Sequence, residues 1–386
     1  MPKIKVLRGN TSSLANYAGS AGEIALNYET GNLMFWTNTA NVYYTLAGAA
    51  AGGGGVSPFQ GSIAGYTIGG TPSYPTLTGD STIQKFTFSS GSPASNIGSF
   101  PSGQWVNAGG ASSDSYGYIY GGYKTNPSSS NYNDNLDKHP FSSDSPGSNV
   151  QTISPSTVPL NRLGQTGHQS LSTGYAYWPS HPGEIKMPFA SDTDAVTYTS
   201  DLGYAYTPSP LQVTSHQASG STSTENRYKS GGYQPNVPFA GYFGLMRNPF
   251  SSDNAIILGS LVWPGYYSAG VSGETAGYAI GGMPNYNSSA STPSPTIYDH
   301  DNIQKYSFSS DGNATDVGQL AQSRNSMAGY SSTTDGYVTG GINRPVNGFD
   351  AVGLDHIYKF PFSSESTVTD QAELVTSRFL SASTQV

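Results

Sequence analysis

Side chains that carry out covalent and metal chemistry are scarce in this chain. It has no cysteine, which excludes thiolate zinc sites, iron–sulfur clusters and cysteine nucleophiles. None of its six histidines lies in an i, i+4 pair or at another spacing typical of metal ligands. Glycoside hydrolysis needs paired carboxylates about 5–9.5 Å apart. Asp299 with Asp301, or Asp350 with Asp355, could meet in a loop, but nothing in the sequence singles them out. We therefore expect no enzymatic activity, no metal and no cofactor.

The composition is that of a polar, weakly charged chain rich in turn-forming and aromatic residues. Among 386 residues there are 48 glycines, 28 tyrosines and 25 prolines, while charged residues make up 10%. Such a composition is typical of all-β proteins with many short strands. The net charge of −8 argues against nucleic-acid binding. No apolar run approaches the roughly 18 residues of a membrane-spanning helix. The first residues lack the apolar stretch of a secretory signal, so we expect neither a signal peptide nor membrane insertion.

Most of the chain is repetitive, and a Phe-(Ser/Ala)-Ser motif marks each repeat. A basic residue lies three positions before the Phe, and Asp or Glu follows every copy except the first. The motif phenylalanines, 48 to 61 residues apart, are Phe88, Phe141, Phe189, Phe250, Phe308 and Phe362. We interpret the Phe as packing between repeats, and the charged residues as ion pairs within or between them. Where proline directly precedes the Phe, strand pairing should end, because proline cannot donate to a ladder.

A second motif, Gly-Tyr-x-x-Gly-Gly, precedes each copy of the first and ends a predicted strand. Its glycine pairs are Gly69-Gly70, Gly121-Gly122, Gly231-Gly232, Gly281-Gly282 and Gly340-Gly341. The third repeat carries a degenerate version over residues 174–179. Each of the six repeats also holds four short strand-like runs separated by turn residues, which is the pattern of a propeller blade.

These motifs resemble the kelch family of β-propellers. An acidic residue ahead of strand three also matches and is present as Asp134, Asp301 and Asp355. An arginine leading into the next strand one is present as Arg162, Arg324 and Arg378. The tryptophan that kelch blades usually carry in strand four is missing. We interpret the arginines as bracing neighbouring blades through backbone carbonyls. The last residues, 377–386, align with the strand-one segment that begins at Ser323. They should therefore supply strand one of the first blade and close the ring. The resemblance implies an all-β, six-bladed propeller over residues 58–386.

A small β-rich unit over residues 1–46 precedes the propeller, separated from it by an Ala/Gly linker over residues 47–57. A unit this short holds too little core to be stable alone. Its segments 5–11, 21–24 and 29–33 resemble the amino-terminal module of bacteriophage tail-fibre and tropism-determinant proteins. The resemblance implies attachment to other virion tail or baseplate proteins, often as a homotrimer. The residues that carry it include Arg8, Gly22, Glu23, Ile24, Gly31 and Leu33.

Recognition is expected in the loops between strands two and three, which vary most in length and are rich in Tyr, Asn and Pro. Long loops on a rigid scaffold often bind ligands, and aromatic faces suit sugar rings by stacking. The candidate binding residues are Tyr74, Tyr123, Tyr132, Trp178, Tyr233, Tyr286, Asn287, Tyr298, Asn343 and Arg344. The alternative interpretation is that these loops only cover one face of the propeller.

Three functions follow from these observations. The first is a phage receptor-binding tail fibre on the virion, whose propeller binds a glycan or protein on the host surface. The second is a structural virion component, such as a baseplate adaptor or decoration protein. The third, a polysaccharide depolymerase, is less favoured. The copper site of galactose-oxidase-like enzymes needs a Cys–Tyr crosslink, and the Ser-x-Asp-x-Gly-x-x-Trp box of sialidases does not occur.

Overall fold

The computed structural model divides the chain into two compact units, Met1–Val56 and Ser57–Val386. It describes residues 6–9, 24–27, 32–36, 41–45, 59–73, 78–103, 105–124, 133–153, 167–171, 173–179, 184–191, 196–198, 218–232, 243–252, 255–283, 299–343, 353–365 and 368–386. Strands are the regular secondary structure found in these ranges. Within them, no helix has the length and apolar character needed to cross a membrane.

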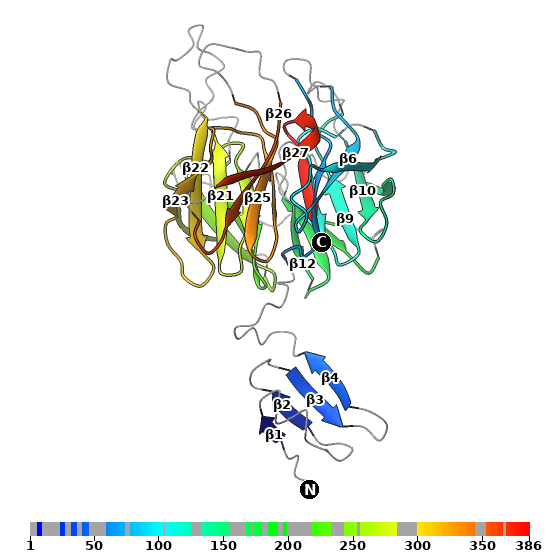
Figure 1. The fold of residues 1–386 in the computed structure, drawn as a ribbon, viewed down its shortest axis with the longest axis vertical. Helices are drawn as coiled ribbons and strands as arrows, with labels where there is room; N and C mark the ends of the chain where they lie inside the picture. Colours follow the sequence, from blue (N-terminus) through cyan, green and yellow to red (C-terminus); the bar gives the residue numbers. More distant parts are fainter. Residues whose placement is uncertain are drawn as a thin grey trace. The chain divides into compact units, whose positions relative to one another are not determined.

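The first unit contains one four-stranded sheet (Figure 1). Its strands are β1 (Val6–Gly9), β2 (Ile24–Asn27), β3 (Asn32–Trp36) and β4 (Asn41–Thr45). β1 and β2 pair in parallel, whereas β2, β3 and β4 pair antiparallel. In the register of β2 and β3, Ile24 pairs with Phe35 and Leu26 with Leu33.

The second unit consists of six antiparallel four-stranded sheets, blades 1 to 6, whose strands one to four run from the centre outward (Figure 1). Blade 1 contains β28 (Ala382–Gln385), β5 (Ala64–Ile68), β6 (Thr82–Thr87) and β7 (Ser95–Ser99). Blade 2 contains β8 (Gly109–Ser112), β9 (Tyr116–Tyr120), β10 (Asn135–Pro140) and β11 (Ser148–Thr152). Blade 3 contains β12 (His168–Ser170), β13 (Tyr175–Pro179), β14 (Glu184–Pro188) and β15 (Val196–Tyr198).

The other three blades follow the same order along the chain. Blade 4 contains β16 (Ser219–Thr222), β17 (Asn226–Ser230), β18 (Gly244–Pro249) and β19 (Ile256–Ser260). Blade 5 contains β20 (Ala269–Ser272), β21 (Ala276–Gly282), β22 (His300–Ser307) and β23 (Thr315–Gln319). Blade 6 contains β24 (Ala328–Ser331), β25 (Asp335–Thr339), β26 (Leu354–Pro361) and β27 (Thr369–Arg378). Strands β10, β14, β18 and β26 each end on the proline that precedes the motif Phe, as predicted.

The two ends of the propeller unit meet in blade 1. β28 pairs antiparallel with β5, which places Ala382 opposite Ile68 and Gln385 opposite Gly65. Neighbouring first strands contact one another all the way around, and β28 contacts both β8 of blade 2 and β24 of blade 6. This arrangement confirms the six-bladed propeller and its closure by the C-terminal strand. Because β28 pairs with β5, blade 1 has all four strands and the inner edge of β5 is not left open.

In blades 1, 4, 5 and 6, the glycine pair at the end of strand two turns the chain and links the blade to the next. Gly69 and Gly70 have φ values of 64° and 90°, a region that side chains with a Cβ rarely adopt. A Cβ on Gly69 would lie 2.5 Å from the carbonyl oxygen of Trp105 in blade 2. The Gly70 N–H donates to that same oxygen. The second glycines of blades 4, 5 and 6 donate in the same way to the segment that leads into the following blade.

Aromatic stacking joins all six blades. A strand-two tyrosine of each blade packs against the motif Phe of the next blade, with ring centroids 4.6–5.7 Å apart; five pairs are stacked and Tyr177–Phe250 is tilted by 35°. The pairs are Tyr66–Phe141, Tyr118–Phe189, Tyr177–Phe250, Tyr228–Phe308, Tyr278–Phe362 and Tyr337–Phe88. The predicted role of the Phe in packing between repeats is therefore confirmed.

Blade 3 corrects one part of the repeat alignment. Tyr177 lies opposite Lys186 just as Tyr66 lies opposite Lys85, so Tyr177 is the motif tyrosine of this blade. The sequence alignment that began the motif at Gly174 was wrong by two residues. The alignment had used the earlier pair Gly174-Tyr175. Gly174 instead lies in the turn before β13, where its φ is 74°.

The motif charges pair between blades, as predicted. Lys85 of blade 1 contacts Asp144 of blade 2 at 2.8 Å, and Arg247 of blade 4 contacts Asp311 of blade 5 at 3.0 Å. Lys305 and Glu365 link blades 5 and 6 in the same way. Blade 1 carries Gly91 where the other blades have the acid. Lys359 of blade 6 accordingly contacts Asp335 of its own blade at 3.8 Å.

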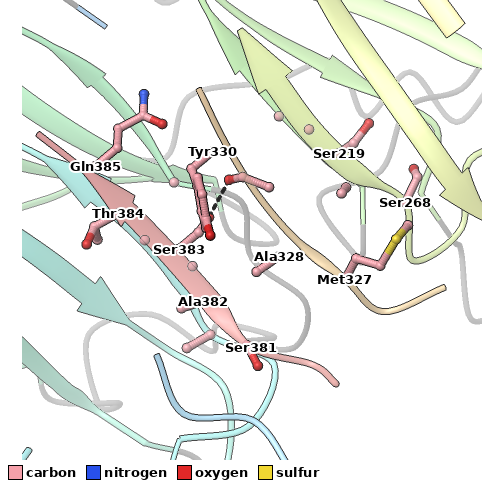
Figure 2. A pocket seen from close by; sticks show the side chains of 18 of the residues that line it. Ser219, Ser268, Met327, Ala328, Tyr330, Ser381, Ala382, Ser383, Thr384 and Gln385 are labelled. Atoms are coloured by element: carbon pink, nitrogen blue, oxygen red, sulfur yellow. Dashed lines mark hydrogen bonds between the residues drawn. The ribbon is translucent and has the colours of Figure 1, made fainter. Parts of the chain in front are cut away.

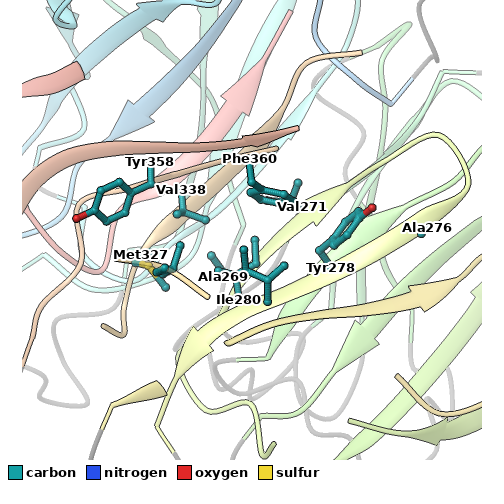
Figure 3. Packing of buried hydrophobic residues seen from close by; sticks show 11 residues of the cluster. Ala269, Val271, Ala276, Tyr278, Ile280, Met327, Val338, Tyr358 and Phe360 are labelled. Carbon is teal, nitrogen blue, oxygen red and sulfur yellow. The ribbon is translucent and has the colours of Figure 1, made fainter. Parts of the chain in front are cut away.

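The hydrophobic core lies largely between adjacent blades. The cluster between blades 5 and 6 is built from strands β20, β21, β22, β25 and β26 (Figure 3). Tyr278 and Ile280 of β21 contribute from one blade, and Val338 and Phe360 contribute from the other. Each blade thus buries both faces against its neighbours, which makes the ring one continuous packed body.

Candidate functional site

The first strands of the six blades surround a central channel (Figure 2). Its volume is about 140 Å³, comparable to a cavity that holds one six-membered ring. Glycine, alanine, serine and threonine make up most of the wall, with the amides of Gln169 and Gln385 and the ring of Tyr330. Among the described lining residues none is charged.

The small residues of the wall allow the inner strands to lie close together. Gly270 of β20 approaches Gly220 of β16 so closely that a Cβ on Gly270 would lie 1.9 Å from the Gly220 carbonyl oxygen. Gly110 and Gly329 occupy the corresponding positions in blades 2 and 6 and have similarly close backbone neighbours. Backbone groups and short hydroxyl side chains therefore form much of the surface that a ligand in the channel would meet.

The chain segment that leads into blade 1 crosses one end of the channel. We call the side where strand one turns into strand two the 1–2 face, and the opposite side the 2–3 face. At the 1–2 face, the Phe59 carbonyl oxygen accepts hydrogen bonds from the amides of Gln385 at 2.6 Å and Gln169 at 3.4 Å. The Gln60 amide donates to the carbonyl oxygens of Ser272 and Ser332, both at 3.0 Å. These bonds tie the segment to blades 1, 3, 5 and 6.

A rim of backbone in the left-handed region frames the channel at the 2–3 face. Asn107, Tyr267, Ser326 and Leu380 occupy matching positions just before strand one, with φ between 56° and 63°. Such values are uncommon for residues other than glycine and are often found where a site is held in a fixed shape. Three hydrogen bonds of 2.7–2.8 Å connect these residues: the Asn107 N–H donates to the Leu380 carbonyl, the Leu380 N–H to the Ser326 carbonyl, and the Ser326 N–H to the Tyr267 carbonyl.

Buried arginines fix the segments that carry this rim. Arg378 donates through Nη1 to the carbonyl of Gly69 at 2.8 Å and through Nη2 to Asp80 and Thr82. Arg324 donates through Nη1 to the carbonyl of Gly340 at 3.2 Å. These bonds confirm the predicted bracing through backbone carbonyls for Arg324 and Arg378, whereas Arg162 lies outside the described residues. Burial lowers the pKa of each guanidinium, and the Asp80 carboxylate acts in the opposite direction on the pKa of Arg378.

The channel is suited to binding an uncharged polar ligand rather than to acid–base chemistry. No described group in its wall titrates near neutral pH, and burial raises the pKa of the Tyr330 hydroxyl further. The Ser268 hydroxyl is buried and has no hydrogen-bond partner among the described residues. Across the described ranges, no cluster of three or more His, Asp or Glu side chains could hold a metal ion.

Three of the predicted binding residues lie in the described part of the propeller. Asn343 is exposed on the 2–3 face, at the start of the loop that follows the Gly340-Gly341 pair. Tyr123 and Trp178 are buried, so their prediction as ligand-contacting residues is corrected. Seven others lie outside the described residues: Tyr74, Tyr132, Tyr233, Tyr286, Asn287, Tyr298 and Arg344.

The two buried aromatics support the scaffold. Tyr123 packs with Val106, Phe379 and Leu380 directly beneath the rim. Trp178 lies between blades 2 and 3, where its indole N–H donates to the carbonyl of Gly109 at 3.1 Å. Their sequence positions near the end of strand two are close to the loops, which made them resemble loop residues. The inward pleat of the strand and the bridge to Val106 bury them instead.

The predicted attachment residues fall on the sheet of the first unit where they are described. Arg8 lies on β1, Ile24 on β2 and Leu33 on β3. Gly22, Glu23 and Gly31 lie outside the described residues.

Two features of the site were missed by sequence reasoning. The rim residues differ in type from blade to blade, so no common residue type in the sequence indicates their backbone conformation. Trp263 follows β19 and is 42% exposed, whereas Trp105 and Trp178 are fully buried. Trp105 and Trp263 both lie in a connection from strand four to the next strand one, so position in the sequence does not distinguish the exposed tryptophan from the buried one.

Comparisons with known proteins bear on the fold. No protein-family model matches the chain, and no curated protein is similar in sequence. Among the solved structures that match is the structure of YjhT, with a TM-score of 0.53 and 12% sequence identity. The match covers 81% of this chain and 100% of that one. At this identity the likeness concerns the fold alone, and it agrees with the β-propeller described above.

Proposed function

We propose that this chain is a receptor-binding tail-fibre protein of a bacteriophage. Residues 1–46 attach it to other tail or baseplate proteins of the virion, as a homotrimer. The 2–3 face of the propeller binds a glycan or a protein on the host surface. Binding alone is sufficient for this role, and several copies on one particle multiply a weak affinity for each site.

The observation that carries the proposal is the uncharged central channel with its fixed rim. The channel offers hydroxyl, amide and backbone groups, which are partners for neutral polar ligands such as sugars. The Phe59-Gln60 segment occupies its 1–2 end, which leaves the 2–3 end for a ligand. The exposed Asn343 begins one of the variable loops of that same face.

The first unit is a separate compact unit, which supports a role in attachment distinct from the receptor-binding role of the propeller. Arg8, Ile24 and Leu33 lie on three neighbouring strands of one small sheet. A four-stranded sheet of this size has little core of its own and gains stability from a partner or from other copies.

Competition with virion adsorption tests the proposal. Host cells are incubated with the full-length protein before addition of virions that carry it, and unadsorbed virions are counted. We expect adsorption to fall as the protein concentration rises. Asn343→Arg, on the 2–3 face, should weaken the competition, whereas the matched change Asp114→Arg, in the exposed turn of blade 2 at the 1–2 face, should not. Undiminished adsorption at saturating protein would contradict receptor binding.

A glycan array probed with the full-length protein separates the other functions. A receptor-binding protein should prefer particular saccharides, whereas an adaptor or decoration protein should show no preference. Release of reducing ends from host polysaccharide would instead indicate a depolymerase.

A further inference from the structure

An exposed tryptophan is held in a fixed position on the 2–3 face, outside the channel. Trp263 lies in the segment that connects β19 of blade 4 to β20 of blade 5. Its backbone N–H donates to Gln304 Oε1 at 2.8 Å, and its carbonyl accepts from Gln304 Nε2 at 3.1 Å. Gln304 is fully buried in β22. One rigid amide therefore fixes both backbone polar groups of Trp263.

The indole ring rests on a neutral imidazole. The ring centroids of Trp263 and His300 are 5.3 Å apart, and the planes are inclined by 41°. Burial lowers the pKa of His300, although the Asp301 carboxylate acts in the opposite direction. The imidazole is thus uncharged at neutral pH and fills the space behind the indole. Trp263 as a whole remains 42% exposed.

Among the described residues, blades 1 and 2 do not repeat the complete two-bond clamp. In blade 1 the buried Gln84 accepts from the backbone N–H of Val375 in β27 of blade 6, while its Nε2 atom has no hydrogen-bond partner. In blade 2, Asp137 accepts from the Ser102 hydroxyl in the segment after blade 1. The contacts at these two junctions therefore form without an exposed aromatic side chain. The exposed indole is a property of the junction between blades 4 and 5.

The size and charge of this surface fit one sugar ring better than a protein. The exposed large apolar residue beside Trp263 in sequence is Val262; the others in the described propeller are Ile63, Ile256, Ile257 and Val375. The surface area of two side chains is far smaller than the roughly 800 Å² of accessible surface that each partner buries in a protein–protein interface. A flat, uncharged π face matches the C–H face of a pyranose, and the indole N–H is available to its hydroxyl groups.

We propose that Trp263, supported by His300, is a stacking platform for the apolar face of a neutral pyranose. The proposal rests on the receptor-binding function and names both a subsite and the chemical class of its ligand. A glycan could then engage the platform with one residue and the loops or the channel with another.

The test uses the full-length protein and a set of methyl glycosides: glucoside, galactoside, mannoside and N-acetylglucosaminide. Binding is followed by indole fluorescence in a Trp36→Phe background, in which the remaining tryptophans of the chain are Trp105, Trp178 and Trp263. We expect at least one glycoside to change the emission, and Trp263→Ala to abolish that change. In saturation-transfer NMR, which needs no tryptophan signal, Trp263→Ala should weaken binding about tenfold, equivalent to about 1.4 kcal/mol. Trp263→Phe should retain part of the affinity.

Val375→Ala is the matched control, because it shortens an exposed apolar side chain on β27, near the junction between blades 6 and 1. It should bind the glycosides like the unchanged protein. Equal binding by Trp263→Ala, or no response to any of the glycosides, would overturn the platform. Adsorption competition that persists alongside such a result would leave the receptor-binding proposal standing. Trp263-dependent glycoside binding without competition would support the platform and contradict only the tail-fibre role.

Discussion

Arg324 and Arg378 precede strand one of blades 6 and 1. Their hydrogen-bond partners differ, and the partners determine how much each buried charge contributes to stability. Arg378 is saturated by a carbonyl, a hydroxyl and the Asp80 carboxylate. Arg324 has one carbonyl bond and lies over the Tyr358 ring at 4.2 Å, while its Nε and Nη2 atoms have no hydrogen-bond partner. Leu354 stands in blade 6 where blade 1 has Asp80, which explains the difference.

We predict that Arg378→Gln destabilises the propeller more than Arg324→Gln. Removing Arg378 breaks a mostly buried ion pair and should lower the free energy of unfolding by about 3 kcal/mol. Removing Arg324 costs one hydrogen bond and a cation–π contact, about 1–2 kcal/mol in total. Chemical denaturation of both variants measures the two values, and equal losses would contradict the role given to Asp80.

A buried histidine should make stability depend on pH. Burial lowers the pKa of His139 from 6.5 to about 3, and its Nε2 atom lies 3.0 Å from the Thr384 hydroxyl. Above about pH 6.5 neither the folded nor the unfolded state carries the proton. Below that pH the unfolded chain binds a proton that the folded chain rejects, so stability falls by up to about 1.4 kcal/mol per pH unit.

The matched variant for this effect is His139→Phe, because Phe86 and Phe360 occupy the same position in blades 1 and 6. Melting temperatures measured from about pH 7 down to about pH 4 should decline less steeply for the variant than for the unchanged protein. Parallel curves would show that His139 does not cause the decline.

At the scale of elements, one tyrosine and one phenylalanine per blade repeat a single contact six times around the ring. Each ring pair joins strand two of one blade to the end of strand three in the next, and Tyr337–Phe88 joins the last blade to the first. The surrounding residues vary, yet the two rings remain in contact between every pair of neighbouring blades. Inter-blade stacking is therefore a better description of what unites the blades than the exposed ion pairs, which contribute at most about 1 kcal/mol each.

A double-mutant cycle can measure this coupling. Tyr66→Leu and Phe141→Leu, made singly and together, should show a coupling free energy of about 0.5–1.5 kcal/mol. Tyr66→Leu combined with Phe189→Leu is the control, since Phe189 stacks on Tyr118 instead. Additive effects for Tyr66 and Phe141 would contradict the stack, as would equal coupling in the control pair.

At the scale of the whole molecule, repetition made the fold predictable from sequence. Six motif phenylalanines fixed the number of blades, and the alignment of residues 377–386 with an internal strand one predicted how the ring closes. Both predictions are confirmed by the pairing of β28 with β5. The third repeat was misaligned because its motif is degenerate and only the register with Lys186 reveals the correct tyrosine.

The site was less predictable because it is made from features that sequence does not display. The channel wall depends on the convergence of small residues from six distant strands. The rim depends on a backbone conformation adopted by residues as different as Asn107 and Leu380. Tyr123 and Trp178 were assigned to binding by residue type and position, whereas their burial follows from packing that depends on neighbouring blades.

The central claim is that the two ends of the propeller unit close one ring of six blades. An engineered disulfide between Thr67 of β5 and Ser383 of β28 tests it directly, because these residues lie opposite each other and the chain has no cysteine of its own. The double variant Thr67→Cys with Ser383→Cys should form an intramolecular disulfide under mild oxidation, seen as a loss of free thiols in a monomeric chain. Persistently free thiols, or crosslinks between chains alone, would contradict the closed ring.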